Sequence, residues 1–61
     1  MNRVIPDTED YHLRSMELCL TREQLGGIKA VESTRWASSI AALKRLGLTD
    51  EQIVERMRER L

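Results

Sequence analysis

The stretch that decides the fold spans residues 20–40 and is LTREQLGGIKAVESTRWASSI. Its TREQ segment, which begins at Thr21, matches a capping box, in which a hydroxyl and an amide side chain satisfy the first N–H groups of a helix. The box predicts a helix over 22–29. Gly26 and Gly27 weaken it, because each glycine costs about 1 kcal/mol relative to alanine inside a helix. The pair therefore indicates either a break or a close helix crossing.

Apolar residues at helical spacing continue before this stretch. Leu13, Met16 and Leu20 predict a helix over about 8–19. We expect residues 1–6 to form a short extended arm, since Pro6 disfavours helix at the residue before it.

Two more helices are expected towards the C-terminus. Ser33 or Thr34 can cap a helix over 33–46, and Gly47 is suited to end it. A second capping box, from Thr49 to Gln52, opens a helix over 50–60. The inner positions of these helices are Trp36, Ile40, Leu43, Ile53, Met57 and Leu61.

The fold class that follows is all-α, a compact bundle of about four short helices over 8–19, 22–29, 33–46 and 50–60. Residues 7–61 form one domain, in which the second helix buries Leu25 and Ile28. Two possibilities stay open for residues 26–32, which either form a turn or continue one long helix over 22–46.

Composition restricts the chemistry of the chain. It has 61 residues, with one cysteine, Cys19, and one histidine, His12. These cannot form an intrachain disulfide, a four-ligand zinc site or a recognisable catalytic triad. We therefore expect no enzyme, cofactor or metal, with Cys19 buried and His12 on the surface.

The size and charge of the chain bear on its partners and location. A core this small gives only marginal stability, which association with a second chain would raise, and we expect a homodimer. No apolar run approaches the ~18 residues of a membrane span, so we expect a cytoplasmic protein without a membrane partner. The net charge is zero, but residues 22–45 carry five cations and two acids, so the middle of the chain is basic.

Residues 20–40 resemble the helix-turn-helix of phage repressor and Cro-type DNA-binding proteins. Leu25 and Gly26 match the apolar residue and small residue of the first helix, and Trp36 matches an inner position of the second. Ala30 stands where the family usually has a turn glycine in the left-handed conformation. Ser39 stands where the family usually packs an apolar residue.

The resemblance implies a small DNA-binding regulator of the phage or mobile-element type, acting in transcription on double-stranded DNA. Phosphate contacts would come from Arg22, Lys29, Lys44 and Arg45. Base-edge or further phosphate contacts would come from Ser33, Thr34, Arg35 and Ser38. The alternative is a small protein-binding inhibitor or antiactivator that docks a helical face on a larger protein, and the zero net charge favours it.

A second stretch with helix-turn-helix spacing covers residues 40–57. Its second helix carries several acids, which repel phosphate. We interpret it as a capped helix that closes the bundle. Trp36 is expected in the core, and a place at an interface is the alternative.

Overall fold

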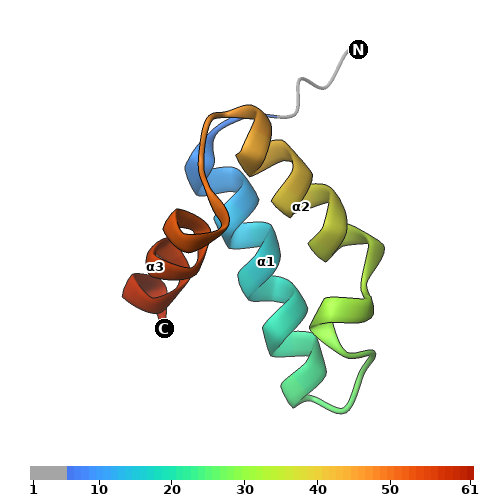
Figure 1. Ribbon diagram of the computed structural model, residues 1–61. Coiled ribbons are helices and arrows are strands. Elements are labelled where there is room, and N and C mark those ends of the chain that lie inside the picture. Colours follow the sequence, from blue (N-terminus) through green and yellow to red (C-terminus); the bar gives the residue numbers. More distant parts are fainter. Residues whose placement is uncertain (1–5) are drawn as a thin grey trace.

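The computed structural model describes residues 6–61, so the expected arm over 1–6 lies outside the described residues except for Pro6. Within that range the chain forms three α-helices and a short 3₁₀ helix, in the order α1 (Glu9–Gln24), η1 (Ala30–Glu32), α2 (Thr34–Arg45) and α3 (Asp50–Arg60). In Figure 1, α1 runs through the middle, with α2 on one side and α3 on the other. The all-α class is confirmed, but three α-helices stand where four were expected.

The first helix, α1, is a single element where the sequence predicted two. The Thr8 hydroxyl accepts a hydrogen bond from the Tyr11 N–H and caps its start. The helix then continues through Thr21, whose hydroxyl donates to the Glu17 carbonyl at 3.1 Å. Thr21 is thus a helix-interior residue that bonds back one turn. The predicted break near 19 and the capping box at Thr21 are wrong.

A glycine pair ends α1. Gly26 has a φ of +91°, the left-handed conformation that glycine adopts without strain. The Gly27 N–H donates to the Arg22 carbonyl at 2.8 Å, and the Gly26 N–H donates to the Glu23 carbonyl at 3.1 Å. These two bonds make a Schellman motif, the common stop signal of helices. The glycines therefore lie past the end of a helix, and the predicted helix over 22–29 does not form.

The same motif ends α2. Gly47 has a φ of +101°, and the Leu48 N–H donates to the Leu43 carbonyl at 3.1 Å. A capping box then starts α3, since the hydroxyl of Thr49 and the amide of Gln52 each accept a backbone N–H. The helix predicted over 50–60 is confirmed with the same bounds, and the one predicted over 33–46 is confirmed with a shift of one residue at each end. The last helix, α3, closes the bundle as interpreted.

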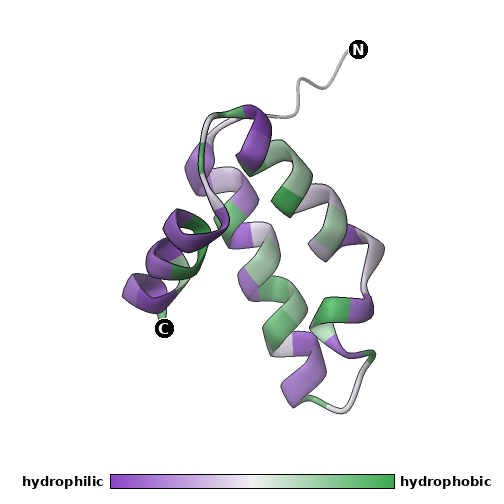
Figure 2. Cartoon of the chain, in the orientation of Figure 1, coloured by the Kyte–Doolittle hydropathy of each residue, from purple (hydrophilic) through white to green (hydrophobic). Residues whose placement is uncertain are grey.

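The hydrophobic core lies where the three helices meet. Its buried residues are Leu13, Met16, Leu43, Ile53 and Met57, and the half-buried Leu20, Trp36, Ile40 and Leu48 pack against them. Figure 2 shows that every helix mixes hydrophobic and hydrophilic residues, as a helix with only one buried side requires.

The turn between α1 and α2 departs from the helix-turn-helix pattern. Leu25 and Ile28 are 83% and 58% exposed, so the prediction that they are buried is wrong. Ala30 is buried instead, and its N–H donates to the Glu23 carboxylate at 2.9 Å. Within residues 6–61 only glycines have a positive φ, so Ala30 does not take the left-handed turn conformation. The helix-turn-helix arrangement over 20–40 is not confirmed.

Candidate functional site

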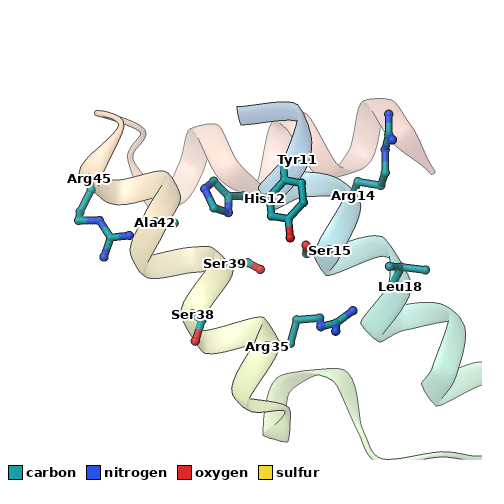
Figure 3. Close-up of a pocket in the computed structure, with 10 residues that line it drawn as sticks. All are labelled: Tyr11, His12, Arg14, Ser15, Leu18, Arg35, Ser38, Ser39, Ala42 and Arg45. Atoms are coloured by element: carbon teal, nitrogen blue, oxygen red, sulfur yellow. The ribbon is translucent and has the colours of Figure 1, made fainter. Parts of the chain in front are cut away.

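A polar hollow lies between α1 and α2, on the side of these helices that faces away from the core. Its volume is about 380 Å³. Figure 3 shows the residues that line it, which include three arginines and three serines but no aspartate or glutamate. The lining residues are Tyr11, His12, Arg14, Ser15, Leu18, Arg35, Ser38, Ser39, Ala42 and Arg45.

The α2 side of the hollow holds two arginines at its two ends. Arg35 and Arg45 lie about 15 Å apart along the axis, because an α-helix rises 1.5 Å per residue. Ser38 and Ser39 lie between them. In Figure 3, Arg35 extends from α2 towards α1, whereas Arg45 lies beyond Ala42 at the opposite end. The hollow is thus an elongated surface with a cation at each end and hydroxyl groups between.

The α1 side adds a stripe at helical spacing, formed by Tyr11, Ser15 and Leu18. Tyr11 packs edge-on against His12, with ring centroids 5.4 Å apart. His12 is held in turn by Asp7, whose Oδ1 lies 2.7 Å from Nε2. These contacts fix the two aromatic rings at the end of the hollow where Arg45 lies.

Acids of α1 are neutralised on the side that faces α3. Arg56 contacts Glu9 at 3.4 Å, and Arg60 contacts both Asp10 and Glu17. The hydrogen bonds with Glu17 and with Asp10 raise the pKa of Arg60 above its usual value. Glu9, Asp10 and Glu17 of α1 are therefore bound to α3, and of these only Asp10 also pairs with an arginine of the hollow, Arg14.

The cations of α2 differ in their surroundings. This helix contains no acidic residue, and its cations are Arg35, Lys44 and Arg45. Lys44 forms an ion pair with Asp50 at 3.0 Å. Within residues 6–61, neither Arg35 nor Arg45 has a carboxylate within ion-pair distance. Arg14, the third arginine of the hollow, is paired with Asp10 at 3.0 Å. Two unneutralised arginines therefore remain on this surface.

Three of the eight residues predicted to contact DNA come together at the hollow, namely Arg35, Ser38 and Arg45. Ser33 is half-buried, and its Oγ lies 3.7 Å from the buried Cys19 Sγ, so it does not belong to the exposed face. Lys44 is turned towards Asp50.

The remaining predicted residues are exposed outside the lining, and they are Arg22, Lys29 and Thr34. Arg22 follows Ser15 and Leu18 at helical spacing, so it extends the same face of α1 by one turn.

Sequence reasoning missed the contribution of α1 to this site. Tyr11, Arg14 and Ser15 gave no motif, because their role depends on α2 lying beside them. The signal that could have found them is the spacing of Tyr11, Ser15, Leu18 and Arg22, which repeats every three or four residues.

Neither a metal site nor a membrane span is found in the part of the chain that the structure describes. Residues 6–61 contain no cluster of three His, Cys, Asp or Glu side chains placed to hold a metal ion. None of the three α-helices combines the length and the apolar character needed to cross a bilayer. Comparisons with protein-family models, with curated proteins and with solved structures find no match to the chain.

Proposed function

We propose that this chain is a small DNA-binding protein of the regulator class, which binds duplex DNA through the face of α1 and α2 around the polar hollow. The observation that carries the proposal is the pair of arginines, Arg35 and Arg45, that have no carboxylate partner on a surface without acids. Phosphate contacts supply most of the affinity of nonspecific DNA binding, and arginine is well suited to form them.

The spacing of the two arginines supports a duplex as the ligand. Their separation of about 15 Å along α2 is comparable with the major-groove width of ≈ 12 Å. Arg35 and Arg45 can thus contact phosphates on the two edges of one groove. Ser38 lies between them, exposed, and its hydroxyl can donate to or accept from phosphate oxygens or base edges.

The zero net charge of the chain is compatible with this proposal, because its charges are separated in space. Glu9, Asp10 and Glu17 of α1 pair with arginines of α3, and Asp10 also pairs with Arg14. These three carboxylates are thus bound to arginines, whereas Arg35 and Arg45 have no carboxylate partner within residues 6–61, so a phosphate at the hollow meets cations that are not neutralised.

The test is a salt titration of binding to a labelled random-sequence duplex, followed by fluorescence anisotropy. Each phosphate contact contributes a slope of about −0.9 in log K against log salt. Contacts from Arg35, Arg45 and one further cation predict a slope of about −2 to −3. A protein that shows no affinity for the duplex at low salt does not have the proposed function.

A second candidate is docking on a larger protein, and one observation favours it. The turn between α1 and α2 exposes Leu25, Ile28 and Val31, which are 83%, 58% and 71% accessible. Exposed apolar groups this close together are typical of interaction sites. Leu25→Ser separates the two functions, because it removes an apolar group from this turn, adds no charge and leaves the polar hollow intact. Unchanged DNA affinity in that variant supports the first proposal, and lost affinity for duplex DNA contradicts it.

A further inference from the structure

The floor of the polar hollow holds a buried hydroxyl group that has no partner. Ser39 is only 4% exposed, yet its Oγ forms no hydrogen bond within residues 6–61. A hydroxyl inside a helix can donate to the carbonyl four residues earlier, as Thr21 does to Glu17, but Ser39 does not. A buried polar group without a partner destabilises a fold, so its presence needs an explanation.

The hydroxyl of Ser39 opens into the hollow. In the part of the chain that the structure describes, no side-chain oxygen or nitrogen that is sealed from solvent lacks a partner. The Ser39 Oγ therefore keeps some contact with solvent, and the hollow that Ser39 lines supplies it. Figure 3 shows this hydroxyl directed from α2 into the space before α1. Helix packing does not require it, because an alanine, Ala42, is buried on the same helix and lines the same hollow.

Three more donors face the same space. Arg35 lies one helical turn before Ser39 on α2, and Tyr11 and Ser15 have the same spacing on α1, so each pair shares a helix face. In Figure 3 the guanidinium of Arg35 and the hydroxyls of Tyr11 and Ser15 all extend into the hollow. Neither of these two hydroxyls forms a hydrogen bond within residues 6–61. The hollow thus presents one cation and three free hydroxyl groups.

This set of donors suits an oxyanion. A phosphate monoester carries about −1.5 to −2 charge at pH 7 and three strong acceptor oxygens, and a guanidinium binds such a group through charge-assisted hydrogen bonds. No carboxylate lines the hollow. Asp7 and Asp10 contact two of its lining residues, and each is bound there, to His12 and Arg14. The hollow therefore favours a phosphate over a neutral or cationic molecule.

The depth of Ser39 favours a small molecule at the floor of the hollow. A DNA duplex is too wide to enter a hollow of about 380 Å³, so it meets the exposed rim, where Ser38 lies. The same volume falls within the range of roughly 300–1,000 Å³ that is typical of small-molecule sites. It exceeds what one phosphate group needs, and the side chains of Tyr11 and Leu18 can contact an organic group in the remaining space.

We infer that the polar hollow binds a small organic phosphate monoester, whose phosphate group pairs with Arg35 and accepts hydrogen bonds from Ser39 and Ser15. Arg35 is also one of the two arginines proposed to contact DNA. The small phosphate and the duplex then compete for it, so that a rise in the concentration of the small phosphate releases the DNA. This competition rests on the proposed function, whereas the binding of the small phosphate does not.

The first experiment is a proton NMR titration of the full chain with adenosine 5′-monophosphate at fixed pH and ionic strength. The chain has one tyrosine, one histidine and one tryptophan, so each ring is identified by its type. Tyr11 and His12 line the hollow, whereas Trp36 packs against the core and does not. The signals of Tyr11 and His12 should shift until they saturate, and those of Trp36 should stay. Inorganic phosphate should bind more weakly, and adenosine and sodium chloride should cause no such shift.

The second experiment repeats this titration on Ser39→Ala. The variant keeps a small side chain at the helix contact and removes only the hydroxyl, so its dissociation constant for the monophosphate should rise about tenfold or more, the usual effect of losing a hydrogen bond to a charged group. Its fold should persist, because the lost hydroxyl has no partner in the protein, and circular dichroism verifies this. Ser38→Ala is the matched control: it removes a hydroxyl from the exposed rim and should change the constant far less.

Several results would overturn the inference. Tyr11 and His12 signals that respond no more to the monophosphate than to chloride mean that the hollow is not a phosphate site. Equal binding of adenosine rules out recognition of the phosphate group, and equal binding of inorganic phosphate rules out a role for the organic group. A folded Ser39→Ala variant that binds like the wild type removes the buried hydroxyl from the site.

None of these titrations contains DNA, so their outcome is independent of the proposed function, which the salt titration tests. The competition is measured separately, with the labelled duplex bound to the wild type. Adenosine 5′-monophosphate should displace the duplex more effectively than chloride at the same ionic strength, and Ser39→Ala should need more of it. If the monophosphate binds but does not displace a bound duplex, the regulatory step is wrong.

Discussion

Nη1 of Arg60 lies 3.0 Å from Oδ1 of Asp10, a residue fifty positions earlier in the chain. The same guanidinium donates from Nε to the Glu17 carboxylate. Arg60 therefore ties the last turn of α3 to the first and third turns of α1. The apolar contact of α3 with the rest of the domain rests on few buried side chains, chiefly Ile53 and Met57, so these ion pairs bear on how firmly α3 is held.

Arg60→Ala should lower the thermal unfolding midpoint by a few degrees, because it releases α3 from α1 and leaves Asp10 and Glu17 without this partner. The loss should shrink in about 1 M salt, where the Debye length is only 3 Å. Arg58→Ala is the matched control, since Arg58 forms no ion pair within residues 6–61. Thermal unfolding followed by circular dichroism measures the midpoints of both variants. Equal midpoints for the two variants would show that the Arg60 contacts do not hold α3.

Substitution of Gly26, the glycine that follows α1, gives a stability change whose direction distinguishes a helix stop from a helix interior. Gly26 has a positive φ, so Gly26→Ala should destabilise the domain by about 1–2 kcal/mol, the cost of the left-handed conformation for a residue with a Cβ. Gly26→Asn should cost less, because asparagine tolerates that conformation better. No atom lies within 4 Å of a Cβ at this position, so steric clash adds nothing.

Urea denaturation measures the effect of these substitutions on the free energy of unfolding. If residues 22–29 instead formed a helix with Gly26 in its interior, the alanine variant would be more stable by about 1 kcal/mol. A gain in stability would thus contradict the helix stop.

This glycine also shows why part of the fold was predictable and part was not. Gly47 and the capping box at Thr49 lie between two clear apolar stripes, so local pattern alone predicted α2 and α3. At the end of α1, the TREQ segment matches a capping box but lies inside a helix, and Gly26 is the stop. The local sequence is therefore compatible with two helices that meet at Thr21 and with one helix that ends before Gly26. The structure favours one helix because the turn after it lets Ala30 reach the core.

The candidate site likewise contains some residues that could be predicted from the sequence and others that could not. Arg35, Ser38 and Arg45 could be predicted because they lie on one exposed face of a helix that the sequence indicates strongly. Lys44 could not be separated from them by sequence, since its ion pair depends on where Asp50 falls after the turn. Tyr11 and Ser15 depend on the packing of α1 beside α2, which no local pattern encodes.

Two leucines that both matched an apolar helical pattern should respond very differently to truncation. Leu43 is fully buried, and Leu43→Ala should cost about 2–5 kcal/mol through lost burial and the cavity left behind. Leu25 is 83% exposed, and Leu25→Ala should change stability by less than about 0.5 kcal/mol. Chemical denaturation followed by circular dichroism compares them. A large loss for Leu25→Ala would place that residue in a core or interface.

The sharpest prediction compares three cations of α2 in DNA binding. Arg35→Ala and Arg45→Ala each remove a cation that has no carboxylate partner at the polar hollow, so each should weaken binding to any duplex and reduce the salt slope by about one. If Arg35 also contacts a base edge, its loss should be about 1–3 kcal/mol larger on the preferred sequence than on others.

Lys44→Ala is the matched control, because it removes the same charge from the same helix. Lys44 is paired with Asp50 and does not line the hollow, so the salt slope should stay near the wild-type value. All three side chains are exposed, and the fold should be unaffected, which circular dichroism can verify. A Lys44→Ala variant that loses as much affinity as the arginine variants would mean that DNA responds to the total charge of α2. The polar hollow would then not be the binding site.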